Sequence, residues 1–385
     1  INNMKKYIFF QIVLFSILFV SCKFEKDDEM KLMVDPSVPA SAEKPDSLIT
    51  LPSGQVVKKV GNDYLWLGDI LLSESDLKSV SEKGYIETEE EKPYEKYLGN
   101  NPITHRSLRE EAIENSNSDA LITASVGVHP SLQRTWLMVR YEYAPDLTPD
   151  RRQIAYKAIL HWEKNTNVRF LNANNIKEKR HPRWGDYPCV IFTNSNKNNS
   201  YVGMSGGRQV INLNSYQHVS AAIHEIGHAI GLYHEHCANN RDNYININYS
   251  NIKPAFRHDF DIQNRTTGIH PMSDGIDFNS IMIYGSYTGD TEAVYDPNKP
   301  MMTKKDGSTW ERSEVLSKFD KMWANKFYLP VIPRNDSYIE LEKIVYKDDN
   351  TIMSERERLN LQGYLNNGRS TPPSPDNRLV NVHTP

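Results

Sequence analysis

One short stretch of this chain constrains its fold and chemistry more than any other. Residues 224–234 read His-Glu-Ile-Gly-His-Ala-Ile-Gly-Leu-Tyr-His, which is the spacing H-E-x-x-H-x-x-G-x-x-H. On a helix, His224 and His228 are four residues apart and project from one face, with Glu225 beside them. Gly231 tolerates the positive φ with which many helices end. The sequence therefore predicts a helix that ends there, followed by a turn that can bring His234 back toward the pair.

The same helix carries an apolar face. Its apolar residues fall roughly opposite the histidines, on an arc at about 140° to 260° around the helix axis: Val219, Ala222, Ile226, Ala229 and Ile230. An ordinary amphipathic helix with incidental histidines is the simpler interpretation. In a chain with 12 His, we put the odds of this spacing arising by chance below roughly one in a thousand. We therefore expect one face to pack into a core while the other binds a metal ion.

Three histidines are the ligand set of a catalytic zinc site. They leave the fourth tetrahedral position open to water, whereas structural zinc sites are usually closed by four protein ligands. Zinc lowers the pKa of bound water to about 7, and Glu225 is placed to take its proton as it attacks a carbonyl. A structural site is the alternative, but His236 follows His234 by only two residues, which makes joint ligation of one ion awkward. We expect one catalytic zinc ion per chain, with His224, His228 and His234 as its ligands.

Two stretches after this motif extend the pattern. Glu235 directly follows the third histidine, and residues 280–285 read Ser-Ile-Met-Ile-Tyr-Gly. Together with the histidine motif, these residues resemble the astacin family of metzincin proteases, in which S-I-M-x-Y-G forms the Met-turn. The resemblance implies that Met282 lies beneath the zinc ligands and that Tyr284 can bind zinc and stabilise the oxyanion. It also implies that Glu235 receives the new N-terminus of the processed enzyme.

The resemblance covers residues 126–330 and implies a metzincin (zincin-like) catalytic domain. That fold class is α+β, with a twisted mixed sheet, two long helices and an irregular C-terminal subdomain. Local signals agree with it. Thr148 and Pro149 precede an apolar helical stripe, and Ser317 with Asp320 is a capping-box start for a closing helix.

Strands are expected at 168–171 and 188–193. By the resemblance, the second strand is the sheet edge that receives substrate. An extended polypeptide that pairs there is held by its backbone, which allows broad sequence tolerance.

The N-terminal residues predict export and a lipid anchor. Translation is expected to start at Met4, and residues 4–21 resemble a lipoprotein signal peptide, because two lysines precede an apolar run of about 14 residues. The run ends Leu-Phe-Val-Ser-Cys, like a bacterial lipobox, so Cys22 would be lipidated, and an ordinary signal peptide with an incidental cysteine is the alternative. The charged residues 26–29 resemble a tether that sends some lipoproteins to the cell surface, and a solvated linker is the alternative. The expected location is the bacterial outer membrane, by a lipid anchor, with surface exposure left open.

Residues 22–125 are expected to form a propeptide. This stretch is polar apart from Tyr-Leu-Trp-Leu-Gly-Asp-Ile at 64–70. Astacin propeptides carry an F-x-G-D motif whose aspartate occupies the zinc and keeps the enzyme latent, and residues 66–69 resemble it with Trp in place of Phe. By that resemblance Asp69 is a latency switch. Gly-Asp is also a common turn pair, so a plain turn is the alternative.

Several positions depart from the family pattern. Asn167 stands where a cysteine is usual, and the chain's 3 Cys are too few for a disulfide scaffold. Cys189 and Cys237 are candidates for a pair, which the sequence leaves open. Residues 331–385 are polar and are expected to form a flexible tail, to which the sequence assigns no function.

These features predict a zinc-dependent endopeptidase, made as a latent zymogen, that hydrolyses peptide bonds in extracellular or surface proteins. A formal net charge of −4 with no basic stripe gives no support for a nucleic-acid partner. The alternative is a surface adhesin that keeps a metzincin fold without turnover. A degenerate protease usually loses its general base, and this chain has both Glu225 and Tyr284. The cleavage preference, the natural substrate and the activating protease are left open.

Overall fold

The computed structural model describes residues 47–87, 126–128, 134–177, 179–181, 185–215, 218–263, 269–271 and 275–385. All of these residues belong to one unit, Lys44–Pro385. The expected signal peptide, the lipidation site Cys22 and residues 88–125 of the expected propeptide lie outside the described residues. Among the described residues, no helix combines the length and the apolar character that a membrane span requires.

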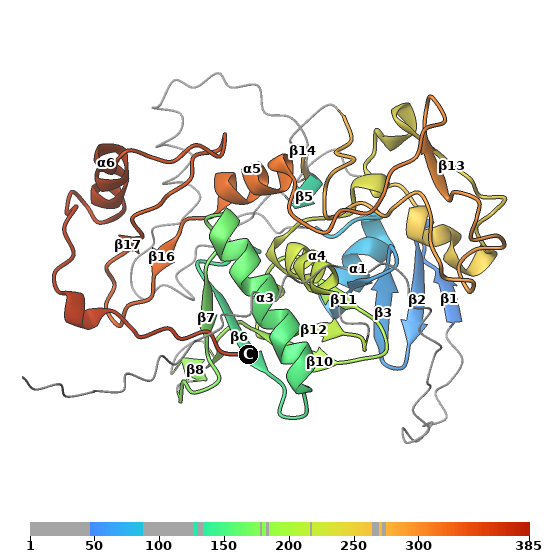
Figure 1. Cartoon of the computed structure of the whole chain (residues 1–385). Helices are drawn as coiled ribbons and strands as arrows, with labels where there is room; N and C mark the ends of the chain where they lie inside the picture. The colour runs from blue at the N-terminus through green and yellow to red at the C-terminus, as the bar shows by residue number, and fades with distance from the viewer. Residues whose placement is uncertain are drawn as a thin grey trace, which may run out of the picture. The chain divides into compact units, whose positions relative to one another are not determined.

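A mixed sheet of nine strands runs through the described residues in the order β1-β2-β3-β4-β11-β12-β10-β6-β7 (Figure 1). Four strands come from residues 47–87, called here the N-terminal segment: β1 (Ser47–Thr50), β2 (Val56–Val60), β3 (Asp63–Trp66) and β4 (Ile70–Leu71). The others are β6 (Val139–Tyr143), β7 (Phe170–Asn172), β10 (Cys189–Asn194), β11 (Asn199–Tyr201) and β12 (Arg208–Leu213). Both parallel and antiparallel pairs occur, so the predicted mixed sheet is present.

Strand β10 lies inside this sheet. It pairs in parallel with β12 on one side and with β6 on the other. Its sequence, Cys-Val-Ile-Phe-Thr-Asn, fits that place, because a parallel strand covered on both faces is nearly continuously apolar. The prediction that residues 188–193 form the substrate-binding edge is therefore wrong. Strand β11 is the last of the strands from residues 139–213 on that side, and β4 pairs with it.

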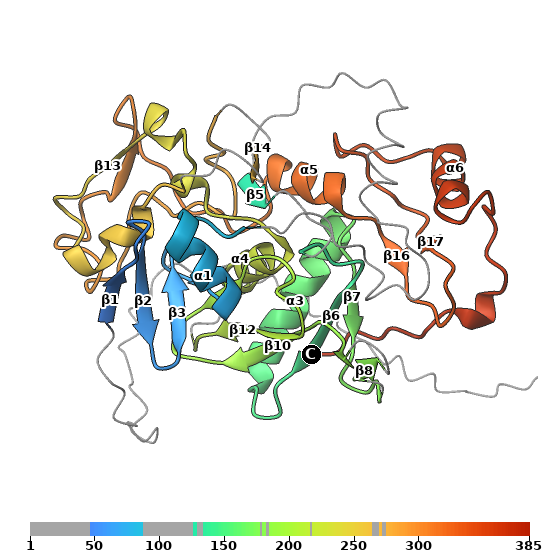
Figure 2. The ribbon, with the colours of Figure 1, turned by 180° about the vertical axis from the view of Figure 1, so that it is seen from behind.

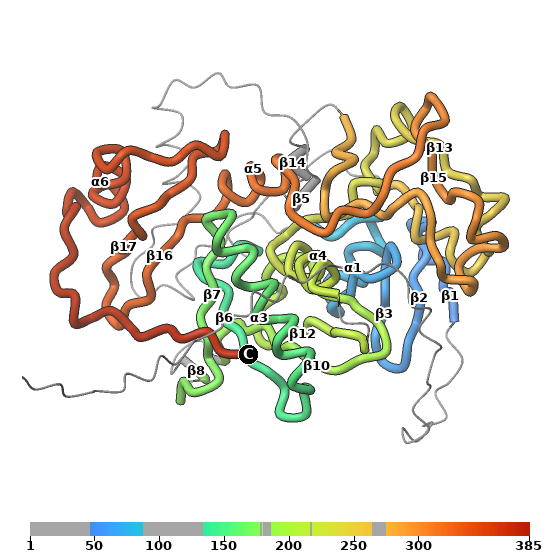
Figure 3. The backbone as a smooth tube through the Cα atoms, in the orientation of Figure 1, coloured from blue at the N-terminus to red at the C-terminus, as the bar shows by residue number. Residues whose placement is uncertain are grey.

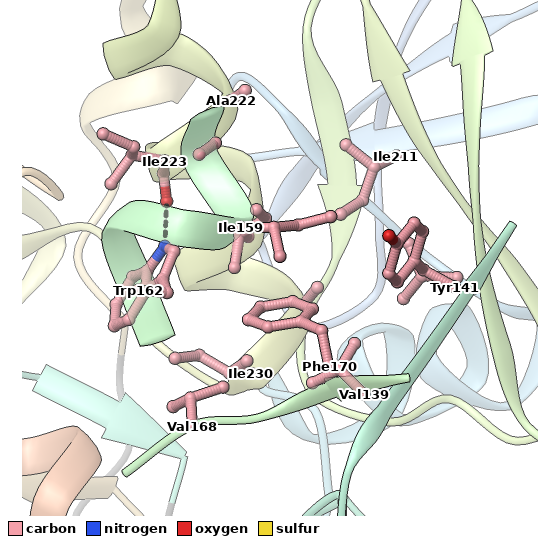
Figure 4. Packing of buried hydrophobic residues seen from close by; sticks show 14 of the residues in the cluster. Val139, Tyr141, Ile159, Trp162, Val168, Phe170, Ile211, Ala222, Ile223 and Ile230 are labelled. Atoms are coloured by element: carbon pink, nitrogen blue, oxygen red, sulfur yellow. Dashed lines mark hydrogen bonds between the residues drawn. The ribbon is translucent and has the colours of Figure 1, made fainter. Parts of the chain in front are cut away.

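Helices α3 (Pro149–Asn165) and α4 (Val219–Ile230) pack together and form the main core with the sheet. Thr148 precedes α3 and Pro149 is its first residue, as expected, although the Thr148 side chain makes no capping bond. Trp162 of α3 is fully buried and donates its indole N–H to the carbonyl oxygen of Ile223 at 3.0 Å (Figure 4). Seen from behind, β10 and β12 lie in front of α3 (Figure 2). Four residues of the predicted apolar arc of α4 are buried in this core, and the fifth, Val219, is partly buried against it.

Two further helices begin with a capping box. Helix α1 (Glu74–Lys83) starts with Ser73 and Asp76, and helix α5 (Lys318–Phe327) starts with Ser317 and Asp320. The start predicted for the closing helix is thus confirmed.

Short elements complete the described structure. The paired short strands are β5 (Val126–Val128) with β14 (Ile269–Pro271), β8 (Arg180–His181) with β9 (Gly185–Asp186), β13 (Ile245–Ile247) with β15 (Met302–Lys304), and β16 (Val331–Ile332) with β17 (Glu340–Leu341). Helix α6 is Glu355–Leu365, and the 3-10 helices are Glu235–Cys237, Arg241–Asn243, Pro254–Phe260 and Pro375–Asn377.

Residues 331–385 are folded, so the expectation of a flexible tail is wrong. They contain β16, β17 and α6. Together with Leu329, their apolar side chains form a separate buried cluster: Val331, Leu341, Val345, Leu361 and Leu365. Glu340 is buried and accepts from Arg334 at 2.5 Å and from Arg378 at 3.0 Å. The chain then returns to the sheet (Figure 3), where the hydroxyl of Tyr141 and Nδ1 of His383 are 3.0 Å apart.

Hydrogen bonds occupy the position where the family pattern has a disulfide cysteine. The side chain of Asn167 donates to the carbonyl oxygen of Tyr346 at 2.8 Å and accepts the N–H of Tyr346 at 2.9 Å. The backbone N–H of Asn167 donates to Asn325 at 2.7 Å. Cys189 and Cys237 are both buried and free, so they do not pair.

Candidate metal centre

Helix α4 and the turn after it bring three histidine side chains together. His224 and His228 lie one turn apart on α4, which ends at Gly231 with a φ of 120°, a value suited to glycine. The chain then returns, so that Nε2 of His234 lies 3.2 Å from Nε2 of both His224 and His228. All three histidines are fully buried. The predicted turn is present, and the three predicted ligands converge.

The outer nitrogens of two imidazoles fix which nitrogen faces the centre. Nδ1 of His224 is 2.8 Å from the carbonyl oxygen of Ile281, and Nδ1 of His228 is 2.8 Å from that of Leu232. A carbonyl oxygen can only accept, so both Nδ1 atoms carry a hydrogen. The neutral rings then direct their Nε2 lone pairs to the centre, as metal ligation requires.

Asp69 reaches the same centre from the N-terminal segment. Its Oδ1 lies 3.1 Å from Nε2 of His234 and 3.3 Å from Nε2 of His228. Its Oδ2 lies 3.5 Å from Nε2 of His224. Burial alone would raise the pKa of Asp69, but the neighbouring imidazoles, His234 foremost, hold it well below its usual value.

The turn between β3 and β4 delivers this carboxylate. It bends through Leu67 and Gly68, whose φ values are 50° and 97°. A Cβ on Gly68 would lie 2.7 Å from the hydroxyl oxygen of Tyr284, so glycine is needed for space as well as for backbone conformation. The Gly-Asp pair does form a turn, and the turn places Asp69 against the histidines.

The converging atoms fit a zinc ion. With zinc–nitrogen distances of about 2.0–2.1 Å, the ligands of a tetrahedral site lie about 3.3 Å apart. The Nε2 separations of 3.2 Å match this spacing. Facing nitrogen lone pairs repel each other at this distance unless a cation lies between them. The buried Oδ1 of Asp69 also has no hydrogen-bond partner among the described residues. Imidazole nitrogens and a carboxylate oxygen are ligands that zinc takes in proteins.

Glu225 lies beside the ligands on α4. It is 2% exposed, and its Oε2 has no hydrogen-bond partner within the described residues. Burial, and then the negative charge of Asp69, raises the pKa of Glu225 well above its ordinary value. A carboxyl group in this setting suits the transfer of a proton.

The predicted Met-turn packs beneath the helix that carries the ligands. Met282 is 1% exposed, and a Cβ on Gly227 of α4 would lie 2.5 Å from its Sδ. The carbonyl oxygen of Met282 accepts the N–H of Glu235 at 3.1 Å. The buried Glu235 side chain accepts the N–H of Asp277 at 3.4 Å. Its role as the partner of a new N-terminus stays a prediction.

Tyr284 borders the centre on the side of Asp69. Its hydroxyl donates to Oδ2 of Asp69 at 3.3 Å, and its ring centroid lies 4.9 Å from that of His234. Burial raises the pKa of Tyr284 well above its usual value, so the group remains a neutral donor.

His236 does not join the ligands. Its ring stacks on His234, with centroids 4.9 Å apart and 21° between the planes. Within the described residues, the side chains whose ligand atoms gather at this centre are Asp69, His224, His228 and His234, and His236 is not among them. The fourth group at the centre is Asp69.

The sequence model of one protease family matches this chain. The model describes Astacin, a family of peptidases, and the match spans residues 128–329, more than half of the chain. The chain belongs to the astacin family. Zinc is the metal that this membership implies, in agreement with the donor set described above.

Astacin relatives from distant organisms are similar to this chain. Flavastacin of Elizabethkingia meningoseptica is 34% identical over 169 residues, which cover 43% of this chain and 34% of that protein. Astacin-like metalloprotease toxin 5 of Loxosceles gaucho is 35% identical over 161 residues, which cover 40% of this chain and 78% of the toxin. The chain spans about a third to a half of the length of the first curated relatives that it matches.

One solved structure can be compared as well. High choriolytic enzyme 1 is a hatching enzyme zinc-protease from Oryzias latipes. Its structural match with this protein covers 55% of this chain and 96% of the enzyme's chain, with 20% sequence identity and a TM-score of 0.42.

The sheet edge beside the metal centre of this astacin is covered by its own N-terminal segment. Strand β4 pairs in parallel with β11, with Ile70 opposite Ser200, and the N–H of Ser200 donates to the carbonyl oxygen of Asp69 at 3.1 Å. Trp66 packs edge-to-face on Tyr233 with centroids 6.3 Å apart. These contacts hold the turn that carries Asp69 at the metal centre.

Sequence reasoning missed the groups that tie this segment to the rest of the astacin domain. The buried Asp76 of α1 forms an ion pair with the partly buried Arg134, whose guanidinium also donates to the carbonyl oxygen of Val202 at 3.2 Å. Asp76 lies at a capping-box position, and in the sequence that role alone explains an acidic residue there. Nothing local therefore indicates a distant ion-pair partner. Only the fold shows that Arg134 is that partner.

A cavity of about 270 Å³ beside Tyr284 was also missed. Asp259 and Arg312 are among its lining residues. Burial, and then the charge of Asp69, raises the pKa of Asp259 to about 8. Neither residue belongs to a motif, so no local signal in the sequence identifies them.

Proposed function

We propose that this protein is a zinc endopeptidase that cleaves polypeptides and is kept latent by its N-terminal segment. Membership of a peptidase family supports the activity. The proposed latency is supported by the position of Asp69, whose carboxylate oxygens lie 3.1–3.5 Å from the Nε2 atoms of all three histidines. A ligand attached to the same chain is hard to compete away, because its effective concentration is typically millimolar or higher.

Each side chain at the centre has a distinct part in the proposed reaction. His224, His228 and His234 would hold a zinc ion, which would supply a Lewis acid for a substrate carbonyl and for water. Glu225 accepts the proton of the attacking water and returns it to the leaving amine. Once Asp69 leaves, the hydroxyl of Tyr284 loses its acceptor and can donate to the developing oxyanion.

The polypeptide substrate would bind along β11 after the N-terminal segment has left. The edge that β4 occupies would then expose the backbone groups of Ser200 and Tyr201. Backbone pairing tolerates many sequences. The cavity beside Tyr284 has a size that suits one substrate side chain.

The activity is tested with a protein that can be processed on demand. A recognition sequence for a specific exogenous protease is inserted between residues 88 and 125, and the zinc-loaded chain is cut there. Cleavage of a quenched-fluorescent peptide library should begin after processing, and the same protein with Glu225→Ala should be about 10²-fold slower or worse. A zinc-loaded, processed wild-type chain that hydrolyses no peptide would favour a binding protein that keeps the fold without turnover.

We also propose that the protein is made with a lipoprotein signal peptide and anchored to the bacterial outer membrane through Cys22. The lipobox-like run before Cys22 supports this. In cells, Cys22→Ser should move the protein out of the membrane fraction and abolish incorporation of a labelled fatty acid. Absence of that label in the wild-type protein would contradict the anchor.

A further inference from the structure

A chain of hydrogen bonds joins the ligand His224 to a carboxylate on helix α5. Nδ1 of His224 donates to the carbonyl oxygen of Ile281 at 2.8 Å. In the same peptide unit, the N–H of Met282 donates to Oγ of Ser280 at 2.9 Å. The Ser280 hydroxyl donates to Oδ1 of Asp320 at 2.6 Å. In each of these hydrogen bonds, the donor lies on the side of the metal centre and the acceptor on the side of Asp320.

Asp320 is fully buried and surrounded by donors. Besides the Ser280 hydroxyl on Oδ1, its Oδ2 accepts the backbone N–H of Ile281 and that of Ser317, each at 2.9 Å. Three such donors stabilise the carboxylate relative to the carboxylic acid. Because the interior screens charge weakly, a carboxylate polarises the hydrogen bonds that end on it, and aligned bonds strengthen one another.

The outer nitrogens of the other two histidine ligands have different surroundings. Nδ1 of His228 donates to the carbonyl oxygen of Leu232, a neutral group in the turn that ends α4. Nδ1 of His234 has no hydrogen-bond partner among the described residues. The outer nitrogen of His224 thus begins a path of hydrogen bonds that ends on a carboxylate.

We propose that Asp320 is a positioning residue of the zinc centre. Through Ser280 and the 281–282 peptide, it holds His224 in the tautomer with hydrogen on Nδ1 and makes Nε2 a stronger electron donor to zinc. This inference rests on the proposed zinc-dependent function and adds an outer residue to it. Groups that support a ligating histidine typically contribute ~10- to 100-fold in metal affinity, and through a serine and a peptide we expect about tenfold.

Helix capping is the competing explanation for Asp320. It is the third residue of α5 and accepts the N–H of Ser317, as any capping-box acid does. Capping requires neither Ser280 nor Ile281. The hydrogen bonds that lead from Asp320 through Ser280 and the 281–282 peptide to His224 are called the relay here. Variants that break the capping interaction and the relay separately can therefore distinguish the two roles of Asp320.

The experiment uses the full-length chain and three variants. Asp320→Asn and Ser280→Ala interrupt the relay at two points. Ser317→Ala removes the capping hydroxyl and its bond to Asp277, and it keeps all three donors that bond the Asp320 carboxylate. Zinc affinity is measured by competition with a chromophoric chelator, and the thermal midpoint of each zinc-free protein reports fold stability. We expect about tenfold weaker zinc binding in the first two variants and a change of less than about twofold in Ser317→Ala. The visible spectrum of the Co²⁺ form should shift in the first two variants only.

Several results would overturn the relay. If Ser317→Ala weakens zinc binding as much as Asp320→Asn does, capping explains the effect. Equal affinity of all four proteins contradicts the relay and leaves the proposed function intact. A wild-type chain that binds no zinc overturns both. If Asp320→Asn does not fold, Ser280→Ala alone decides the matter.

Discussion

Gly68→Ala should release Asp69 from the metal centre without altering any metal ligand. The residue has a φ of 97°, and an alanine in the left-handed region costs about 1–2 kcal/mol. In addition, its Cβ would lie 2.7 Å from the Tyr284 hydroxyl oxygen and 3.3 Å from Cγ of Asp259, so the turn must move. Since 1.4 kcal/mol is a factor of ten in an equilibrium constant, the backbone cost alone shifts the Asp69-bound state by about tenfold.

Gly61→Ala is the matched control. Gly61 lies in the same N-terminal segment with a φ of 58°, and a Cβ there meets nothing within 4 Å. It incurs a similar backbone cost, but in the turn between β2 and β3, which does not carry Asp69, and without any overlap at the metal centre. The difference between the two variants isolates the effect of strain in the turn that carries Asp69.

The assay compares uncleaved, zinc-loaded proteins on one quenched-fluorescent peptide. Gly68→Ala should be at least about tenfold more active than uncleaved wild type, whereas Gly61→Ala should stay near the wild-type level. A Gly68→Ala protein that binds zinc yet is as silent as wild type would refute the reasoning. Equal activation by Gly61→Ala would do so too, because general loosening of the segment would then be the cause.

Three further predictions concern residues around this centre. In the processed enzyme, Tyr284→Phe should lower kcat with little change in KM, because the hydroxyl acts on the transition state; loss of zinc or fold in this variant would make Tyr284 a structural residue. Asp76→Asn leaves the partly buried Arg134 without its charge partner, so chemical denaturation of the full chain should show a loss of about 3 kcal/mol, and an unchanged midpoint would argue against the ion pair. Asn167→Ala removes both side-chain bonds to Tyr346, so the free energy of unfolding should fall by about 2 kcal/mol; no loss would mean that these bonds do not replace the missing disulfide.

The parts of the site that the sequence predicted are those set by local spacing. His224 and His228 share a helix face whatever the rest of the fold does, and Gly231 marks the end of that helix within a few residues. Asp69 and Tyr284 were predicted only through resemblance, because nothing local brings either residue to the histidines.

The parts that the sequence did not predict depend on distant pairing. Strand β10 has the apolar run of a buried strand, but whether it lies inside or at the edge follows from β6 and β12, which are non-local partners. Residues 331–385 look polar because their buried apolar residues are scattered without a period. The sequence identifies Asp320 only as a helix-capping residue. Its hydrogen-bonded connection to His224 passes through the Met-turn, which is distant in the sequence.

The most direct test of the proposed latency is the activity of uncleaved Asp69→Ala beside that of uncleaved wild type. Both proteins are loaded with zinc and assayed on the same quenched-fluorescent peptide, with intact mass checked before and after. If the Asp69 carboxylate blocks the metal centre, Asp69→Ala should hydrolyse the peptide without processing, or become active far sooner, while wild type stays silent. If both proteins stay equally silent, and both become active once the chain is cut between residues 88 and 125, the N-terminal segment acts by covering the site and Asp69 is only a turn residue.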